Sequence, residues 1–318
     1  MQDDQKSLVR DRVDRRGFLQ CMAWAGTGVV WTVSGGVLSS RAFGYQSGPR
    51  GDFSFVQISD SHIGFAKPPN LDVTATLQVA VDRINALNDR PELLLHTGDL
   101  THLAKPEEFD TVAEVLKGAK VGKVLYVPGE HDFDSDDNQL YLARYGKGTK
   151  GRGWHSVDYK GVHFVGLVNV ANAKSGSPMA GLGELGVEQL NWLKKDLASV
   201  SASTPVVVFA HVPLWMVYEK WGWGTKDAAQ ALSLLKRFGS VTVLNGHIHQ
   251  VMQKVEGKVM FHTARSTAFP QSEPGKGTPG PMRDVPAERL RGVLGLTTVD
   301  YIERQGSLAI ADPKLDQD

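Results

Sequence analysis

The stretch PELLLHTGDL (residues 91–100) contains the pattern that decides the fold: a short apolar run that ends at a Gly-Asp turn. Two other stretches are built in the same way. FSFVQIS (residues 53–59) leads directly to Asp60, and KVLYVPGEHD (residues 123–132) ends in three polar residues after a Pro-Gly turn. Short apolar runs that stop at turn residues predict buried β-strands.

The segments between these strands have the periodicity of amphipathic helices. TLQVAVDRINALN (residues 76–88) places Leu77, Val81 and Ile84 on one helical face, and EEFDTVAEVLKGA (residues 107–119) predicts a second helix. Strands and helices therefore alternate through the first half of the chain. This order is typical of a layered α/β fold.

The second half of the chain continues the alternation. We expect further elements at residues 154–168 (two strands), 186–200 (a helix), 204–213 and 241–250 (strands), 253–264 (a hairpin) and 292–310 (a strand pair). The sequence has no internal repeat and no interdomain linker. It therefore predicts one domain over residues 43–318.

The charge of the chain does not favour a polyanionic partner. The 318 residues include 35 basic and 35 acidic side chains, so the formal net charge is zero. A balanced charge gives no bulk attraction for nucleic acid or an anionic membrane. We therefore expect no nucleic-acid polymer as a partner.

Residues 1–42 have the layout of an export signal. Arg15 and Arg16 precede a weakly apolar, glycine-rich run (residues 21–38), and a small-x-small site ends at Ala42. The paired arginines resemble the twin-arginine signal, which the twin-arginine export machinery recognises. We expect cleavage after Ala42, a periplasmic or otherwise extracytoplasmic location, and no stable membrane span in the mature protein. The alternative is a signal that is retained as an N-terminal anchor.

This signal has consequences for cofactors. The twin-arginine route exports folded proteins, often with a cofactor already bound, and so favours a protein with a metal or another prosthetic group. Cys21 is the only cysteine and lies within the signal, so the mature chain would contain no thiol. Disulfides and thiolate metal ligands are therefore excluded.

Side chains that bind metal ions or transfer protons follow the predicted strands. They are Asp60, His62, Asp99, Glu130, His131, Asp132, His211, His247 and His249. The carboxyl ends of the strands in an open α/β sheet form the crevice where ligands bind. Five segments therefore deliver carboxylates and imidazoles to one edge of the fold.

These residue types indicate a particular class of metal. Imidazole and carboxylate ligands without thiolates suit zinc, manganese or iron. A carboxylate such as Asp99 can bridge two ions about 3.5–4 Å apart, which is the spacing of two-metal hydrolytic sites. Such a pair of ions lowers the pKa of a bound water and clamps a phosphoryl oxygen.

The order of the motifs resembles that of the calcineurin-like metallophosphoesterase superfamily. The motifs are Asp-x-His (60–62), Gly-Asp (98–99), Gly-x-His-Asp (129–132), His211 and Gly-His-x-His (246–249). TGDLTH, LYVPGEHD and LNGHIHQ are most similar to the bacterial branch with cyclic-nucleotide phosphodiesterase-like members. The resemblance implies a four-layer α/β/β/α sandwich and two divalent or mixed-valence metal ions (Mn, Fe or Zn). It also implies hydrolysis of a phosphate mono- or diester by a hydroxide that bridges the metals.

The resemblance assigns a role to each motif residue. The implied ligands are Asp60, His62 and His249 for the first ion, His211 and His247 for the second, and Asp99 as the bridge. His131 would stabilise developing charge or protonate the leaving oxygen without binding metal. Asp132 would orient His131.

Glu130 departs from the family pattern, which has an asparagine at this position. Asparagine would bind the second ion through a neutral oxygen, whereas glutamate adds a negative charge and one methylene. The extra charge weakens the site as a Lewis acid but can hold the second ion more tightly. We expect Glu130 to bind the second ion. The alternative is that Glu130 points away and the second site is weak or empty.

Two groups of residues near the motifs have open roles. His96 and His102 flank the Thr-Gly-Asp turn, where each either orients a ligand or is an ordinary, partly buried histidine. Residues 215–224 are rich in aromatic side chains. This segment could contact the substrate, plug the edge of a sheet or bind a second subunit. The substrate contacts would be Trp215, Trp221 and Trp223.

The sequence therefore predicts an exported, metal-dependent phosphoester hydrolase. A competing hypothesis is a metal-binding accessory protein of the same fold with weak or no catalysis, which binds a partner through residues 215–224. The presence of His131 favours the enzyme. The motifs leave the substrate, the metal and the oligomeric state open.

Overall fold

The computed structural model describes residues 31–34, 37–40, 51–133, 138–170, 182–303 and 306–317. The chain divides into two units, residues 1–49 and residues 50–318. In the first unit, strands β1 (Trp31–Ser34) and β2 (Val37–Ser40) pair antiparallel. The twin arginines and the expected cleavage position lie outside the described residues. Within the described part of the chain, no helix is long and apolar enough to cross a membrane.

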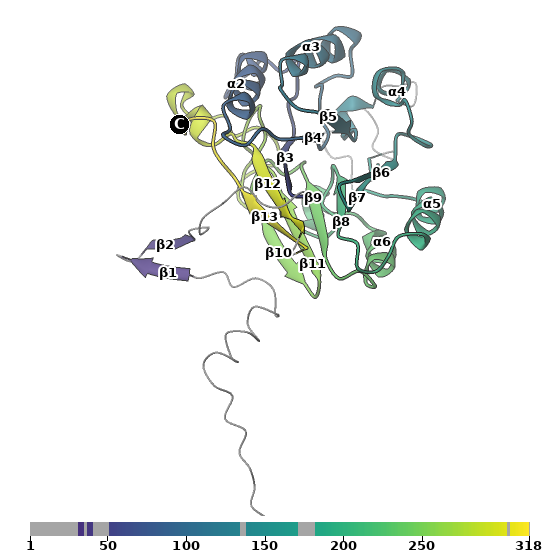
Figure 1. Cartoon of the computed structure of the whole chain (residues 1–318). Coiled ribbons are helices and arrows are strands. Elements are labelled where there is room, and N and C mark those ends of the chain that lie inside the picture. The colour runs from purple at the N-terminus through teal and green to yellow at the C-terminus, as the bar shows by residue number, and fades with distance from the viewer. Residues whose placement is uncertain are drawn as a thin grey trace, which may run out of the picture. The chain divides into compact units, whose positions relative to one another are not determined.

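Two β-sheets form the centre of the second unit (Figure 1). The five-stranded sheet, in the order β13-β12-β3-β4-β5, contains β3 (Phe53–Ile58), β4 (Leu93–His96), β5 (Lys123–Tyr126), β12 (Thr297–Ile302) and β13 (Ser307–Ala311). The six-stranded sheet, in the order β10-β11-β9-β8-β7-β6, contains β6 (His155–Tyr159), β7 (Val162–Gly166), β8 (Val206–Ala210), β9 (Val241–Asn245), β10 (Gln253–Glu256) and β11 (Val259–Thr263). β3, β4 and β5 are parallel, as are β7, β8, β9 and β11.

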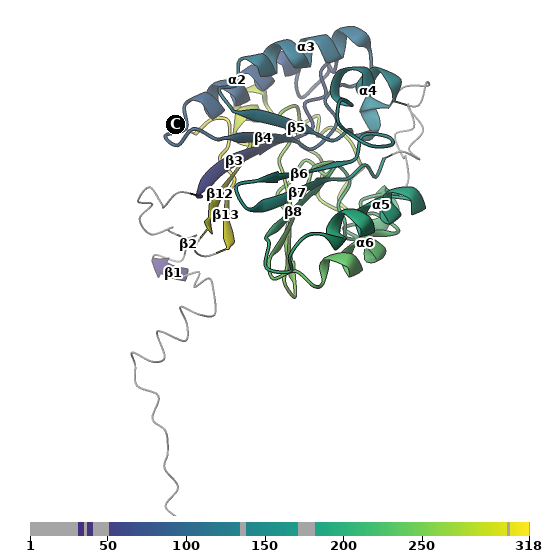
Figure 2. The same ribbon diagram turned by 45° about the vertical axis from the view of Figure 1, so that its right-hand side comes forward.

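Helices cover the outer face of each sheet (Figure 2). The layer on the five-stranded sheet contains α2 (Val73–Asn85), α3 (Pro106–Lys117) and α4 (Gln139–Tyr145). The layer on the six-stranded sheet contains α5 (Val187–Ala198) and α6 (Ala228–Leu235). Short 3-10 helices lie in the loops of the described chain: η1 (Glu130–Asp132), η2 (Glu219–Trp221) and η3 (Ala287–Gly292). The predicted four-layer α/β/β/α sandwich is confirmed.

Hydrophobic clusters fill the spaces between the layers. Between the sheets, the rings of Phe55 and Phe164 meet edge-on with centroids 5.3 Å apart. Leu77 of α2 and Phe109 of α3 are fully buried against the first sheet, and Leu193 of α5 is fully buried against the second. Strands that are covered on both faces read as continuous apolar runs. β4 is covered by helices on one face and by the second sheet on the other, so all three of its leucines are buried.

The helices differ from the predicted ranges in ways that local chemistry explains. α2 begins at Val73, three residues before the predicted start, because the Asp72 side chain accepts a hydrogen bond from the Ala75 backbone nitrogen at 2.9 Å and caps the helix. The periodicity predicts neither α4 nor α6. These helices have seven and eight residues, which is too short for a clear helical repeat.

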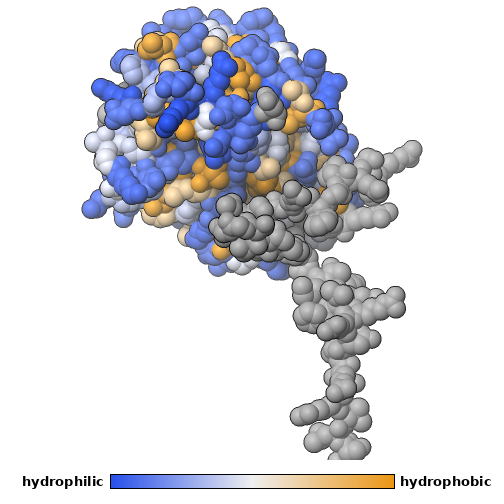
Figure 3. Space-filling model, turned by 90° about the vertical axis from the view of Figure 1, so that its left-hand side faces the viewer, coloured by the Kyte–Doolittle hydropathy of each residue, from blue (hydrophilic) through white to orange (hydrophobic). Residues whose placement is uncertain are grey.

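The surface of the described residues offers little continuous apolar area. On the face shown in Figure 3, hydrophobic residues lie between more numerous hydrophilic ones. The exposed large hydrophobic side chains come from separate segments: Leu71, Leu103, Val187, Met216, Val255, Met282 and Val293. Single exposed hydrophobic residues are normal on protein surfaces and do not mark an interface.

Candidate metal centre

The expected ligands meet at one end of the two sheets, in the loops that follow five strands. Asp60 and His62 follow β3, Asp99 follows β4, Glu130 begins η1 after β5, His211 follows β8, and His247 and His249 follow β9. The site is therefore assembled from both sheets. The seven side chains form overlapping groups whose ligand atoms lie within 4.8 Å of one another.

Most of these residues have an unusual backbone conformation. The φ angles of Asp60, His62, Asp99, His247 and His249 are 55°, 42°, 50°, 70° and 53°. Positive φ is uncommon for residues other than glycine, although Asp and His tolerate it better than most. Such costly conformations persist where the surrounding structure enforces them, and they cluster at functional sites.

Two glycines let the loops after β4 and β5 approach each other. At Gly98, whose φ is 99°, a Cβ atom would collide with the His211 ring and with the Gly129 backbone nitrogen. At Gly129, a Cβ atom would collide with the Asp99 carboxylate. Both positions therefore require glycine if the ligands are to meet.

Asp60, His62 and His249 form the first candidate ion group. All three side chains are buried. His249 Nε2 lies 3.2 Å from Asp60 Oδ1 and 3.3 Å from His62 Nε2. Three donor atoms from two loops therefore converge on one position.

Glu130, His211 and His247 form the second candidate group. Glu130 Oε2 lies 3.0 Å from His211 Nε2, and Glu130 Oε1 lies 2.9 Å from His247 Nδ1. The glutamate therefore points into the second group, and the alternative orientation away from it does not occur. Whether Glu130 binds an ion stays a prediction.

Asp99 lies between the two groups. Its Oδ2 is 3.3 Å from His211 Nε2 and 3.4 Å from His62 Nε2, so one oxygen faces a member of each group. Its Oδ1 accepts a hydrogen bond from the His131 backbone nitrogen at 2.9 Å. The carboxylate is therefore fixed in the position that a bridging ligand requires.

The donor atoms fit divalent cations. Glu130 Oε2, His211 Nε2 and His247 Nδ1 are buried and have no hydrogen-bond partner within the described residues, although they lie at ion-pair distances. Buried polar atoms are nearly always satisfied, so atoms that face one another without hydrogen bonds indicate a cation site. A set of carboxylates and imidazoles without thiolates suits zinc, manganese or iron.

Charges within the site shift its pKa values. Burial would raise the pKa of Asp60, but His249 and His211 outweigh burial and lower the pKa to about 2. Burial also opposes the ionisation of Glu130, yet His247 and His211 hold its pKa well below the usual value. Both carboxylates are therefore ionised at neutral pH, which is the state that binds cations.

Backbone carbonyls orient two of the histidine ligands. His211 Nδ1 lies 2.7 Å from the Thr97 carbonyl oxygen, and His249 Nδ1 lies 2.5 Å from that of Phe269. Because a carbonyl only accepts, Nδ1 carries the proton in each ring. Nε2 is therefore left free to bind an ion.

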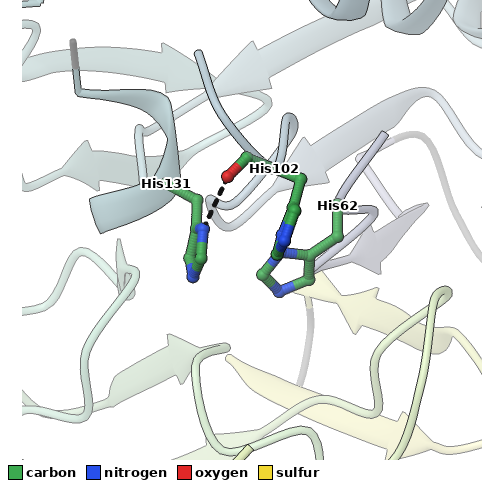
Figure 4. A group of neighbouring side chains, drawn as sticks. All are labelled: His62, His102 and His131. Carbon is green, nitrogen blue, oxygen red and sulfur yellow. Dashed lines mark hydrogen bonds between the residues drawn. The ribbon is translucent and has the colours of Figure 1, made fainter. Parts of the chain in front are cut away.

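His131 lies beside both groups and is held in a similar way. Its Nδ1 donates a hydrogen bond to the His102 carbonyl at 2.8 Å (Figure 4). Burial lowers the pKa of His131, but the carboxylates of Asp99 and Glu130 outweigh burial and raise it. Nε2 of His131 is therefore the ring atom available for chemistry.

The structure corrects the expected role of Asp132. Its buried carboxylate accepts hydrogen bonds from the backbone nitrogens of Leu100, Thr101 and Gly129 at 3.0, 2.8 and 2.9 Å. These bonds tie the loop after β4 to the loop after β5. Asp132 therefore holds the two loops together, whereas a backbone carbonyl orients the His131 ring.

His96 contacts the site from outside the ligand groups, whereas His102 forms a further group with His62 and His131. His96 is fully buried, its Nε2 lies 2.8 Å from Ser61 Oγ, and burial lowers its pKa to about 3. It therefore supports the loop after β3 from behind. His102 is half-buried, and burial together with His131 lowers its pKa to about 4.

The aromatic segment 215–224 lies partly against the protein interior. Trp223 is 2% exposed, and the Trp215 ring packs on Phe261 of β11 with centroids 5.2 Å apart. The expected substrate contact is therefore corrected for Trp223, because a ring with almost no exposed surface cannot stack on a substrate. For Trp215 and Trp221, which are half-buried, it stays a prediction.

Phe269 belongs to the site although no sequence motif predicts it. Its ring stacks on His62 with centroids 4.7 Å apart and an interplanar angle of 28°, and it lies 4.7 Å from the His249 ring. It comes from a Pro- and Gly-rich loop whose composition indicates function without identifying a residue. The sequence also does not predict that the Thr97 carbonyl orients His211, because any residue supplies a backbone carbonyl.

Comparison with known proteins identifies the family of the chain and proteins that share its fold. Residues 53–251 match the model of the calcineurin-like phosphoesterase family. A probable cyclic nucleotide phosphodiesterase of Rhodococcus erythropolis is 24% identical over 70% of this chain and 73% of its own length. A probable glycerophosphodiester phosphodiesterase of Arcobacter nitrofigilis is 26% identical over 66% of this chain and 77% of its own. A dimetal phosphatase from Danio rerio shares the fold, with a TM-score of 0.58, 15% identity and coverage of 83% of this chain and 96% of that chain.

Proposed function

We propose that this chain, which belongs to the calcineurin-like phosphoesterase family, is an exported phosphodiesterase that works with two metal ions. The observation that carries the proposal is the convergence of the expected ligands, with three buried donor atoms that face one another without hydrogen-bond partners in the described structure. Metal-dependent phosphoester hydrolysis agrees with the names of the relatives and with the dimetal phosphatase fold.

The residues divide between two ions. In this proposal the ligands are Asp60, His62 and His249 for the first ion, Glu130, His211 and His247 for the second, and Asp99 for both. When bound, two such ions act as Lewis acids on the phosphoryl oxygens and lower the pKa of a water molecule. The fold holds the ligand atoms in place before an ion binds, which lowers the entropic cost of ion binding.

His131 acts on the leaving group. Its Nδ1 is hydrogen-bonded to the His102 carbonyl, so its Nε2 is the ring atom left to act on a phosphoester. The carboxylates of Asp99 and Glu130 outweigh burial and raise its pKa when no ion offsets their charge. A protonated Nε2 can donate its proton to the departing oxygen or stabilise the charge that develops there.

The charge of the site favours a diester over a monoester. Asp60, Asp99 and Glu130 offset three of the four positive charges that two divalent ions would bring. A phosphodiester carries one negative charge, whereas a monoester carries nearly two at neutral pH. The site then carries one net positive charge, or none once a hydroxide bridges the ions, so it compensates the single charge of a diester better than the double charge of a monoester. Both relatives described above are named as phosphodiesterases.

A pair of chromogenic substrates tests this proposal. Purified protein loaded with manganese, zinc or iron should hydrolyse bis(p-nitrophenyl) phosphate faster than p-nitrophenyl phosphate. Faster turnover of the monoester would reject the diester assignment. No turnover of either compound with any metal, in protein that binds two ions, would support the accessory-protein hypothesis.

Export is the second part of the proposal and rests on the N-terminal sequence. Replacing Arg15 and Arg16 by lysine should leave the protein in the cytoplasm, because the twin-arginine machinery requires the arginine pair. Cell fractionation with an antibody to residues 50–318 measures the outcome. Unchanged export of the double variant would reject the twin-arginine assignment.

A further inference from the structure

His102 contacts two functional histidines at once (Figure 4). Its Nδ1 lies 3.4 Å from His62 Nδ1. Its ring stacks on the His131 ring with centroids 4.9 Å apart and an interplanar angle of 14°. Its carbonyl accepts the Nδ1 hydrogen bond of His131 at 2.8 Å. One half-buried residue therefore touches both an expected metal ligand and the expected proton donor.

The Nδ1 atom of His62 has a side chain as its hydrogen-bond acceptor, whereas the Nδ1 atoms of two other expected ligands have backbone carbonyls. In His211 and His249, the Nδ1 atom donates to a carbonyl, which no side-chain substitution removes. His62 Nε2 faces the first ion group, 3.3 Å from His249 Nε2, so Nδ1 must carry the proton when Nε2 binds an ion. The acceptor beside that Nδ1 is His102 Nδ1.

The loop that presents His102 is anchored on the protein side. Glu108, which is 5% exposed, accepts hydrogen bonds from the backbone nitrogens of His102 and Leu103 at 3.2 and 2.8 Å. The His102 nitrogen also donates to the Ile63 carbonyl at 2.9 Å. The imidazole is therefore carried by a fixed turn, so its distances to the neighbouring rings are set by the fold.

We propose that His102 is a positioning residue that holds His62 for the first ion and His131 for proton transfer. Its Nδ1 accepts a hydrogen bond from the Nδ1–H of His62, which keeps His62 Nε2 directed at the ion, in the way that outer acceptors fix metal-binding histidines. Its ring covers one face of His131 and restricts rotation of that ring about the Cβ–Cγ bond. The inference rests on the proposed function, because it uses the assignment of His62 to the first ion.

Three substitutions separate the acceptor from the ring. His102→Asn retains an acceptor, because Oδ1 takes the place of Nδ1, but removes the stacked ring. His102→Phe retains a ring against His131 and removes the acceptor, and His102→Ala removes both. His155→Phe is a matched control, because His155 is a half-buried histidine on β6 that lies outside the ion groups.

The zinc affinity of the full chain tests the contact between His102 and His62. Competition with a chromogenic chelator should show that His102→Phe and His102→Ala weaken one of the two zinc sites by about 10- to 100-fold, the usual effect of losing an outer acceptor. His102→Asn should keep an affinity close to that of the wild type. Wild-type zinc affinity in both His102→Phe and His102→Ala would overturn the inference. Far-UV circular dichroism of each metal-free variant shows whether it folds, and His102→Ala serves as the acceptor-free variant if His102→Phe does not.

Turnover at saturating zinc tests the stacking of the His102 ring on His131. His102→Phe should keep most of the wild-type kcat because its ring still packs on His131, whereas His102→Asn and His102→Ala should lower kcat. Equal kcat in all three variants would reject the role of the stack. If the wild type hydrolyses no phosphoester, the proposed function fails, and the zinc affinities still decide whether His102 positions His62.

Discussion

Replacing Glu130 by glutamine should weaken the binding of the second ion without disrupting the fold of the site. The substitution preserves the length of the side chain and removes its charge, so the two contacts at 3.0 and 2.9 Å to His211 and His247 keep their geometry. If Glu130 is a ligand, the second ion loses its interaction with one full negative charge. The first ion, held by a different group of side chains, should be little affected.

The position of Glu130 sets the size of this effect. Two unit charges about 4 Å apart interact by about 1 kcal/mol in water and by about 4 kcal/mol near a protein surface. The Glu130 side chain is only 17% exposed, so the larger value applies to it, and the double charge of the ion increases the interaction further. The cost of desolvating the buried carboxylate, which glutamine does not carry, offsets much of this gain. We therefore expect a loss of about 2–3 kcal/mol, which corresponds to a rise in Kd of about 30- to 150-fold.

Metal titration and turnover together test this prediction. The Kd of each ion is measured by chelator competition in the wild type, in Glu130→Gln and in Glu130→Asn. Glu219→Gln, an exposed acid in η2, is the control. At saturating metal, Glu130→Asn should retain or exceed wild-type activity, because a neutral oxygen leaves the ions more positive. An unchanged second Kd in both Glu130 variants would show that the carboxylate is not a ligand and would refute the charge argument.

Three further substitutions test other parts of the structure. His131→Ala should lower kcat by about 10²- to 10⁴-fold with two ions still bound, and loss of an ion would instead make His131 a ligand. Asp132→Asn should lower the free energy of unfolding by about 1–3 kcal/mol in urea titrations, because Asp132 ties two loops together; wild-type stability with lost activity would argue for a catalytic role. Burial lowers the pKa of His163, but hydrogen bonds to Asp196 and Asp158 at 2.9 and 2.7 Å outweigh burial and raise it. Protonation of His163 therefore stabilises the fold below the unfolded pKa of about 6.5, and this stability disappears as pH rises through the folded pKa. His163→Gln should thus cost more stability at about pH 6 than at about pH 9, and equal losses would contradict the sign.

Short motifs at strand ends made the fold and the ion groups predictable from the sequence. The turn after each strand is set by adjacent residues, so the positions of Asp60, Asp99 and His211 in the sequence suffice to assign them to one edge of the fold. With the strands arranged in two sheets, the two groups of donors follow from the carboxyl ends of those strands.

Features that depend on contacts between distant segments were not predictable in the same way. Phe269 reaches His62 only because the loop after β11 folds back over the site. Asp132 directs its carboxylate to backbone nitrogens that are more than 25 residues away in the chain, so its motif position suggested a different role. The burial of Trp223 was also not predictable, because an aromatic cluster has the same sequence pattern whether its rings face the solvent or the core.

Elemental analysis of the protein purified from its native cells, combined with hydrolysis of bis(p-nitrophenyl) phosphate by the same sample, tests the central proposal most directly. The proposed site requires two metal ions per chain and turnover that a chelator abolishes and added metal restores. Two tightly bound ions without hydrolysis of any phosphoester would contradict the enzymatic function. Hydrolysis that persists after both ions are removed would contradict the role of the metal centre.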